Sequence, residues 1–170
     1  MPEFVFQSSL PASHRDALER LVFFNQRQRQ AEGAIAHAID LYGSPVIAAD
    51  ATGLRLVVGA RDDVQCLFAL TTNRRGVELA GMVVYLRVSI EEILVLHIAV
   101  ADRFSRTRRS GLEVVVALVR AVREAARRLR GVKRLRMLYV HGRQFRIAIG
   151  QRPPCETDAA QISSSPDTSL

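Results

Sequence analysis

The chain has 170 residues, of which 48% are hydrophobic and 24% charged, as expected for one globular domain with a buried core. Lysine and arginine outnumber aspartate and glutamate by 24 to 17, and the resulting net charge of +7 favours anionic partners. No apolar run reaches the roughly 18 residues that cross a bilayer, and the absence of tryptophan argues against a base-stacking surface for single-stranded nucleic acid.

The N-terminal part of the chain predicts one strand and two helices. Residues 3–6 are a short apolar run, and apolar side chains at helical spacing follow between Leu18 and Phe24. A second helical pattern runs from about residue 31 to residue 42, where Gly43 and Pro45 end it.

After residue 45 the spacing of hydrophobic residues changes from the helical period to the alternation that is typical of strands. Runs at 46–50, 54–59, 65–72, 78–88 and 91–100 are separated by short turn-like pieces, so we expect an antiparallel meander. The last run, EEILVLHIAV, is apolar on both faces, which predicts a central strand covered on both sides.

The helical period returns between residues 110 and 130. The expected apolar face consists of Val115, Leu118, Val119, Val122, Ala126 and Leu129. Residues 132–140 predict a further strand, so the helix would join two parallel strands of one sheet. A last short strand is expected at 145–150. Residues 151–170 are polar and predict a disordered tail, which leaves a single domain over residues 1–150.

A basic loop, HIAVADRFSRTRRSG at 97–111, precedes the long helix. A helix N-terminus offers free backbone N–H groups and the positive end of the helix dipole, which together favour phosphate. Arg106, Arg108 and Arg109 add positive charge, and Gly111 allows close approach of the backbone.

Several of these segments resemble the GNAT superfamily of N-acetyltransferases. LHIAVADRF is similar to the end of that family's fourth strand, LAGMVVYLRV with its early Gly81 to the third strand, and LEVVVALVRAVREAARRLRG and LRMLYV follow in the family's order. The resemblance covers roughly residues 3–140. It implies an α/β fold of GNAT-like type, with a mixed, largely antiparallel sheet, flanking helices and a parallel crossover around residues 93–140.

The resemblance also implies a function. The chain would move an acetyl group from acetyl-CoA to the amine of an unknown acceptor. The backbone of Ile98, Ala99 and Val100 would hold the pantetheine arm and polarise the thioester carbonyl. The pyrophosphate would be held by Arg106, Thr107, Arg108, Arg109, Ser110 and Gly111. A two-fold homodimer is common for such folds, and the sequence leaves it open.

The sequence departs from the family pattern in two places. The family's loop reads Gln/Arg-x-x-Gly-x-Gly/Ala, and with Arg106 in the first position Arg109 replaces the first Gly and Gly111 takes the last position. An ungapped alignment on VADRF instead starts the motif at Ser105 and ends it at Ser110. The family's fourth helix, which carries a Tyr that protonates the leaving thiolate, has no counterpart in HGRQFRIAIG.

Two residues are candidates for acid–base chemistry. A carboxylate near the start of the fourth strand could act as general base, and we select Glu92, although an exposed turn pair with Glu91 is the alternative. On strict alternation Glu92 shares a face with Leu94, Leu96 and Ile98, and Glu91 shares the other with His97. Tyr139 is the candidate general acid.

The remaining titratable residues carry fewer implications. We expect His97 to be a core or edge histidine, and the other histidines lack metal-ligand spacing, so no metal site is predicted. Cys66 and Cys155 lie far apart, and the N-terminus lacks the pattern of a secretory signal, so we expect a cytoplasmic protein without membrane contact.

The alternative function belongs to another class. About half of the lysine and arginine residues fall between Arg103 and Arg136. A non-catalytic protein of the same fold could use this arginine-rich surface to contact nucleic acid or an acidic partner. Nucleic acid is not the favoured partner, because a charged exposed face on this helix is ordinary.

Overall fold

The computed structural model describes residues 3–25, 28, 31–61, 63–74, 76–140 and 143–149, with the backbone alone at 139–140 and 143–147. The helices are α1 (Arg15–Phe23), α2 (Glu32–Tyr42) and α3 (Arg108–Arg127), with a short 3-10 helix at Ala12–His14 before α1. The strands are β1 (Phe4–Gln7), β2 (Pro45–Asp50), β3 (Gly53–Val58), β4 (Val64–Asn73), β5 (Gly76–Arg87), β6 (Glu92–Val100), β7 (Arg134–Val140) and β8 (Arg143–Ala148). The predicted elements are thus confirmed over residues 4–148, while the predicted tail at 151–170 lies outside the described residues.

The main sheet has six strands in the order β1-β4-β5-β6-β7-β8. Every neighbouring pair is antiparallel except β6 and β7, which are parallel and joined through α3. The fold is therefore mixed α/β, with a mostly antiparallel sheet and one parallel crossover, as the strand and helix pattern predicts. None of the helices in the described part of the chain is long and apolar enough to cross a membrane.

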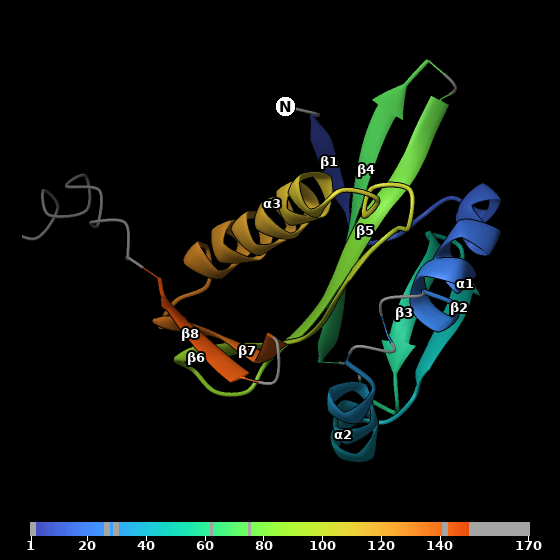
Figure 1. Cartoon of the computed structure of the whole chain (residues 1–170). Helices are drawn as coiled ribbons and strands as arrows, with labels where there is room; N and C mark the ends of the chain where they lie inside the picture. Colours follow the sequence, from blue (N-terminus) through green and yellow to red (C-terminus); the bar gives the residue numbers. More distant parts are fainter. Residues whose placement is uncertain are drawn as a thin grey trace, which may run out of the picture.

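Two hydrophobic clusters cover the two faces of this sheet. One contains the buried face of α3 together with side chains of β5, β6 and β7. The other contains residues of α1 and β3 together with the opposite faces of β4, β5 and β6. Figure 1 shows the same arrangement, with α3 on one side of the sheet and α1, α2 and the β2–β3 hairpin on the other. The central position predicted for β6 is confirmed, since its residues enter both clusters.

The prediction of one continuous meander is wrong for β2 and β3. These strands pair with each other as a separate two-stranded sheet. Leu54 of β3 also forms an isolated antiparallel bridge with Leu10. The edge of β4 that β3 would need is occupied by β1, which pairs with it from Phe4↔Thr71 to Gln7↔Phe68. The hairpin instead packs its buried side chains, Leu54, Leu56 and Val58, on the face that α1 also covers.

The buried face of α3 differs from the predicted one. It consists of Gly111, Val114, Leu118, Val122 and Ala126. A Cβ atom on the β5 glycine Gly81 would lie 2.9 Å from Val114 Cγ1 and 3.3 Å from Leu118 Cδ1. The missing side chain at Gly81 therefore lets the first turns of α3 approach the sheet closely and turns Val114 inward. Leu129, expected on this face, follows the end of the helix and is 43% exposed.

Candidate functional site

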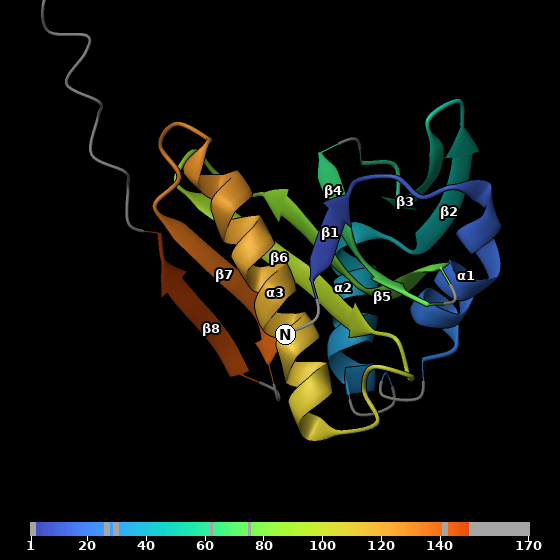
Figure 2. The same ribbon diagram turned by 90° about the horizontal axis from the view of Figure 1, so that it is seen from above.

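The parallel strands β6 and β7 are paired over only part of their length. Their register runs from Glu92↔Arg134 to Val95↔Met137, although β6 continues to Val100 and β7 to Val140. Figure 2 shows the carboxyl ends of the two strands diverging on the side where α3 begins. Among the residues that the structure describes, the second half of β6 therefore has a strand partner on one side only, which is β5.

A β-bulge lies at the point of separation. Val84 is opposite His97, whereas the next residue of β5 is opposite Val95, so Leu96 is the extra residue. As a result Leu96 and His97 both line a pocket on the α1 and α2 side of the sheet. Ile98 packs on the α3 side. The predicted alternation, with Ile98 on the face of Leu96, is wrong because the bulge shifts the period by one residue.

Beyond the bulge, alternate residues of β6 turn their backbone groups away from β5. Ala101 donates its N–H to the carbonyl of Ala80 at 2.9 Å, and an antiparallel ladder alternates between hydrogen-bonded and non-hydrogen-bonded residues. Since Ala101 is a hydrogen-bonded position, Ala99 is one too, and the residues between and before them, Val100 and Ile98, are non-hydrogen-bonded positions. Val100 and Ile98 therefore direct their N–H and C=O groups to the side from which β7 has separated.

One of these backbone groups is already engaged. The side-chain amide of Asn25, which follows α1 and is 7% exposed, donates to the carbonyl of Val100 at 2.9 Å. The Val100 N–H and both backbone groups of Ile98 remain directed toward the open side. Ala99 occupies the hydrogen-bonded kind of position, so its backbone groups face β5.

The basic loop joins this edge of β6 to the N-terminus of α3. Thr107 is the N-cap residue, and its Oγ1 accepts a hydrogen bond from the N–H of Ser110 at 3.1 Å, while its carbonyl accepts from Gly111 at 3.2 Å. The first four N–H groups of a helix have no partner within it. Within the described part of the chain, those of Arg108 and Arg109 therefore remain to bind a ligand or water.

The arginine side chains of the loop are exposed. Arg106, Arg108 and Arg109 lie at the surface, and Arg109 has a loose ion pair with Glu113 at 3.5 Å. Arg103 forms an ion pair with Glu78 of β5, which fixes the start of the loop to the sheet. The helix end and its arginines thus form a positively charged site at the carboxyl end of β6.

Glu92 lies at the other end of β6. Arg136 Nε donates to its Oε1 at 2.7 Å, and Arg134 lies 3.9 Å from its other oxygen. Along an extended strand this position is roughly 26 Å from Val100, so the structure does not bring Glu92 together with the loop at 106–111. Its role as general base stays a prediction, as does that of Tyr139, whose side chain lies outside the described residues.

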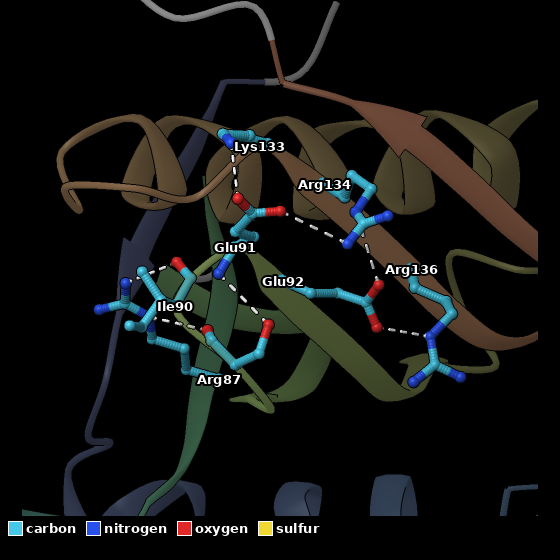
Figure 3. A network of polar contacts seen from close by, with 8 residues as sticks. Arg87, Ile90, Glu91, Glu92, Lys133, Arg134 and Arg136 are labelled. Carbon is cyan, nitrogen blue, oxygen red and sulfur yellow. Dashed lines mark hydrogen bonds and ion pairs between the residues drawn. The ribbon is translucent and has the colours of Figure 1, made fainter.

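Glu91 and Glu92 belong to a surface cluster of ion pairs between the starts of β6 and β7 (Figure 3). Lys133 Nζ lies 2.5 Å from Glu91, and this hydrogen bond lowers the pKa of the Glu91 carboxyl below its ordinary value. Arg87 donates to the carbonyls of Ile90 and Arg130 at the same end. The interactions hold charged groups to each other and to the backbone, which favours a role in joining the two parallel strands.

His97 follows the extra residue of the bulge, Leu96, and lies on the face of the sheet that α1 and α2 cover. His97 lines a pocket of about 70 Å³ between α1, α2 and the sheet, together with apolar side chains such as Ile35, Ile39 and Met82. Burial lowers the pKa of His97 to about 4, so the imidazole is neutral at pH 7. The sequence predicts a core or edge histidine, and the structure places His97 half-buried on the central strand β6. Its position in the pocket is not predicted, because the bulge has no local signal in the sequence.

No group of three or more His, Cys, Asp or Glu side chains in the described part of the chain is arranged to hold a metal ion. Cys66, the cysteine within that part, is buried, and burial raises the pKa of its thiol. Comparison of the chain with protein-family models, with curated proteins and with solved structures finds no match.

Proposed function

We propose that this protein is an acyl-CoA-dependent N-acetyltransferase, which moves an acetyl group from acetyl-CoA to an amine. The observation that carries the proposal is the meeting of two binding features at one end of β6. The first is the backbone edge of Ile98 and Val100, left open where β7 separates. The second is the positively charged N-terminus of α3, which seven residues separate from the end of β6.

The two features suit the two parts of coenzyme A. Its pantetheine arm is an extended chain with amide groups, and the N–H and C=O groups of Ile98 can pair with such amides as a neighbouring strand would. Its pyrophosphate suits the free N–H groups of Arg108 and Arg109 and the surrounding arginines. The short loop at 101–107 keeps both features close together.

The replacement of a loop glycine by arginine is compatible with this use. Arg109 and Ser110 lie inside α3, where the helical backbone has negative φ and any residue is accepted. Neither position therefore requires glycine for its conformation. The element order also supports the proposal, because β1, the first two helices, β4, β5, β6, α3 and β7 follow the order of the GNAT superfamily, with the β2–β3 hairpin inserted after α2.

The chemistry follows from these positions. In the transfer, the acceptor nitrogen forms a bond to the thioester carbonyl carbon, the C–S bond breaks, and the nitrogen loses one proton. An N–H of Ile98 or Val100 directed at the carbonyl oxygen would stabilise the negative charge that develops there. Asn25 would support this by fixing the carbonyl of Val100 and with it the end of the strand.

Isothermal titration with acetyl-CoA tests the proposal. We expect micromolar binding by the wild type and about tenfold weaker binding by Arg109→Glu, a change of about 1.4 kcal/mol. Arg120→Glu is the matched control, since it makes the same charge change at an exposed position near the middle of α3. Absence of binding at millimolar acetyl-CoA, or an equal loss in both variants, would contradict the proposal.

The second candidate function is contact with nucleic acid or an acidic protein. It is favoured by exposed arginines in the second half of α3 and in the turn after it, namely Arg120, Arg127, Arg128 and Arg130. In this case Arg120→Glu, and not Arg109→Glu alone, would weaken retention of DNA or RNA, and log affinity would fall linearly with log salt. The same two variants therefore separate the two functions.

A further inference from the structure

The outer face of α3, beyond its first residues, has no part in the proposed acetyl transfer. The buried residues of this helix all lie on the face that packs on the sheet. Figure 1 shows α3 as the helix on its side of the sheet, so none of the described helices or strands covers the opposite face. This outer face is therefore open to a partner.

Five residues of the outer face form a line along the helix. They follow one another at spacings of four, four, three and four residues, which keeps them within a narrow band of the helix surface. The band is roughly 22 Å long at the rise of an α-helix. We call it the α3 seam, and its members are Leu112, Val116, Arg120, Arg123 and Arg127.

The N-terminal end of the α3 seam is apolar. The side chain of Leu112 is 58% exposed and that of Val116 is 37% exposed. Because the two residues are one turn apart on the same side of the helix, their side chains adjoin. They offer a small continuous apolar surface, which a partner would stabilise by covering it with apolar side chains of its own.

The C-terminal end of the seam is basic. Neither the exposed Arg120 nor the half-buried Arg123 forms an ion pair with a described residue. Arg127 lies 3.3 Å from Glu124 in an exposed pair, and such pairs are weak and easily exchanged. Guanidinium groups bind carboxylates through two parallel hydrogen bonds, so this end of the seam suits an acidic partner.

The two ends of the seam together restrict the class of partner. The arginines alone suit nucleic acid as well as an acidic protein, but a phosphate backbone offers little apolar surface to Leu112 and Val116. A second copy of α3 packed along the seam would set arginine against arginine at Arg120, and like charges at an interface oppose binding.

We propose that the α3 seam binds an acidic amphipathic helix of another protein. Apolar side chains of that helix would cover Leu112 and Val116, and its carboxylates would face the three arginines. The spacing fits this partner, since helices pack by fitting together side-chain rows three and four residues apart. The proposal goes beyond acetyl transfer and does not depend on it, because the seam lies outside the open edge of β6 and the loop at 106–111.

Fluorescence anisotropy with a labelled synthetic peptide tests the proposal. The probe is a helical peptide of about 18 residues, with leucine and glutamate on one face and alanine and glutamine on the other. It should bind the full chain with a micromolar dissociation constant. A scrambled peptide of the same composition should bind about tenfold more weakly. Equal binding of the two peptides would overturn the proposal, because it would mean that net charge alone is recognised.

Two pairs of substitutions locate the binding surface. Leu112→Ala should weaken peptide binding about fivefold, whereas Leu129→Ala, at a 43% exposed leucine after the end of α3, should leave it unchanged. Arg120→Glu should weaken it about tenfold. Arg128→Glu makes the same charge change at an exposed residue about a third of a turn away from the seam and should have a much smaller effect. Equal effects within either pair would contradict the assignment.

A duplex DNA oligonucleotide and acetyl-CoA complete the experiment. If DNA binds and the peptide does not, with a loss in Arg120→Glu but not in Leu112→Ala, the surface binds nucleic acid and the proposal is wrong. Acetyl-CoA titration separates this proposal from the transferase function. Peptide binding without acetyl-CoA binding would contradict acetyl transfer and keep the seam, and acetyl-CoA binding without peptide binding would do the opposite.

Discussion

Acidification from pH 7 to pH 5 should destabilise the folded protein through His97. Burial lowers the pKa of this imidazole from the ordinary 6.5 to about 4. Between these values the unfolded chain binds a proton at this site that the folded protein does not bind. The contribution of the neutral His97 to the free energy of unfolding is therefore fully present above pH 6.5 and is lost as the pH falls toward 4.

The size of the effect follows from the two pKa values of His97. One pKa unit corresponds to about 1.4 kcal/mol, so the full shift of the His97 pKa lowers the free energy of unfolding by about 3 kcal/mol once the pH has fallen below both pKa values. The part between pH 7 and pH 5 is worth about 2 kcal/mol. Asp50, Asp63 and Glu91, whose pKa values are lowered by their hydrogen-bond partners, titrate mainly below this window and do not obscure it.

Urea unfolding at pH 7, 6 and 5 measures this effect. The wild type should lose about 2 kcal/mol more over this range than His97→Gln, which cannot bind the proton. His37→Gln is the matched control, because His37 is an exposed histidine of α2, and it should follow the wild type. Parallel pH dependences of the wild type and His97→Gln would refute the reasoning, since they would mean that His97 is not held neutral.

Three further substitutions test the packing around the site by equilibrium unfolding. Gly81→Ala should cost about 1–3 kcal/mol, because its Cβ would lie 2.6 Å from a carbonyl oxygen of β6. Gly33→Ala should instead stabilise α2 by up to about 1 kcal/mol, because beyond its own helix backbone and chain neighbours its Cβ would meet no described atom within 4 Å. Leu118→Ala should cost about 2–5 kcal/mol, because the side chain is fully buried, and the exposed Leu112→Ala should change stability by less than about 0.5 kcal/mol. Asn25→Ala should cost about 1–3 kcal/mol, because it leaves the last carbonyl of β6 without its buried donor; no change would mean that water replaces the amide.

Much of the fold follows from local pattern. The alternating runs between residues 45 and 100 predict five strands, and all five are present within a few residues of the expected limits. The end of α2 is also predictable, since Gly43 adopts a positive φ of 93° directly after Tyr42. These features depend on neighbouring residues, so the sequence itself contains the information.

Pairing between distant strands is harder to predict. Nothing local in β3 indicates that β1 takes the edge of β4, because that outcome depends on two segments more than fifty residues apart. The inward turn of Val114 likewise depends on Gly81, which belongs to another strand. In both cases the competing arrangements have the same local pattern, and only tertiary packing separates them.

The bulge at Leu96 shows most clearly why the candidate site was only partly predictable. The run LVLHIAV contains no glycine or proline to mark an irregularity, and its alternation reads as a regular strand. One extra residue nevertheless places His97 in a pocket, turns Ile98 to the opposite face, and coincides with the last paired residues of β6 and β7. Because a strand has a period of two, this single insertion decides which side chains meet a ligand on each face. A substitution that removed the bulge would therefore alter the pocket and the open backbone edge together.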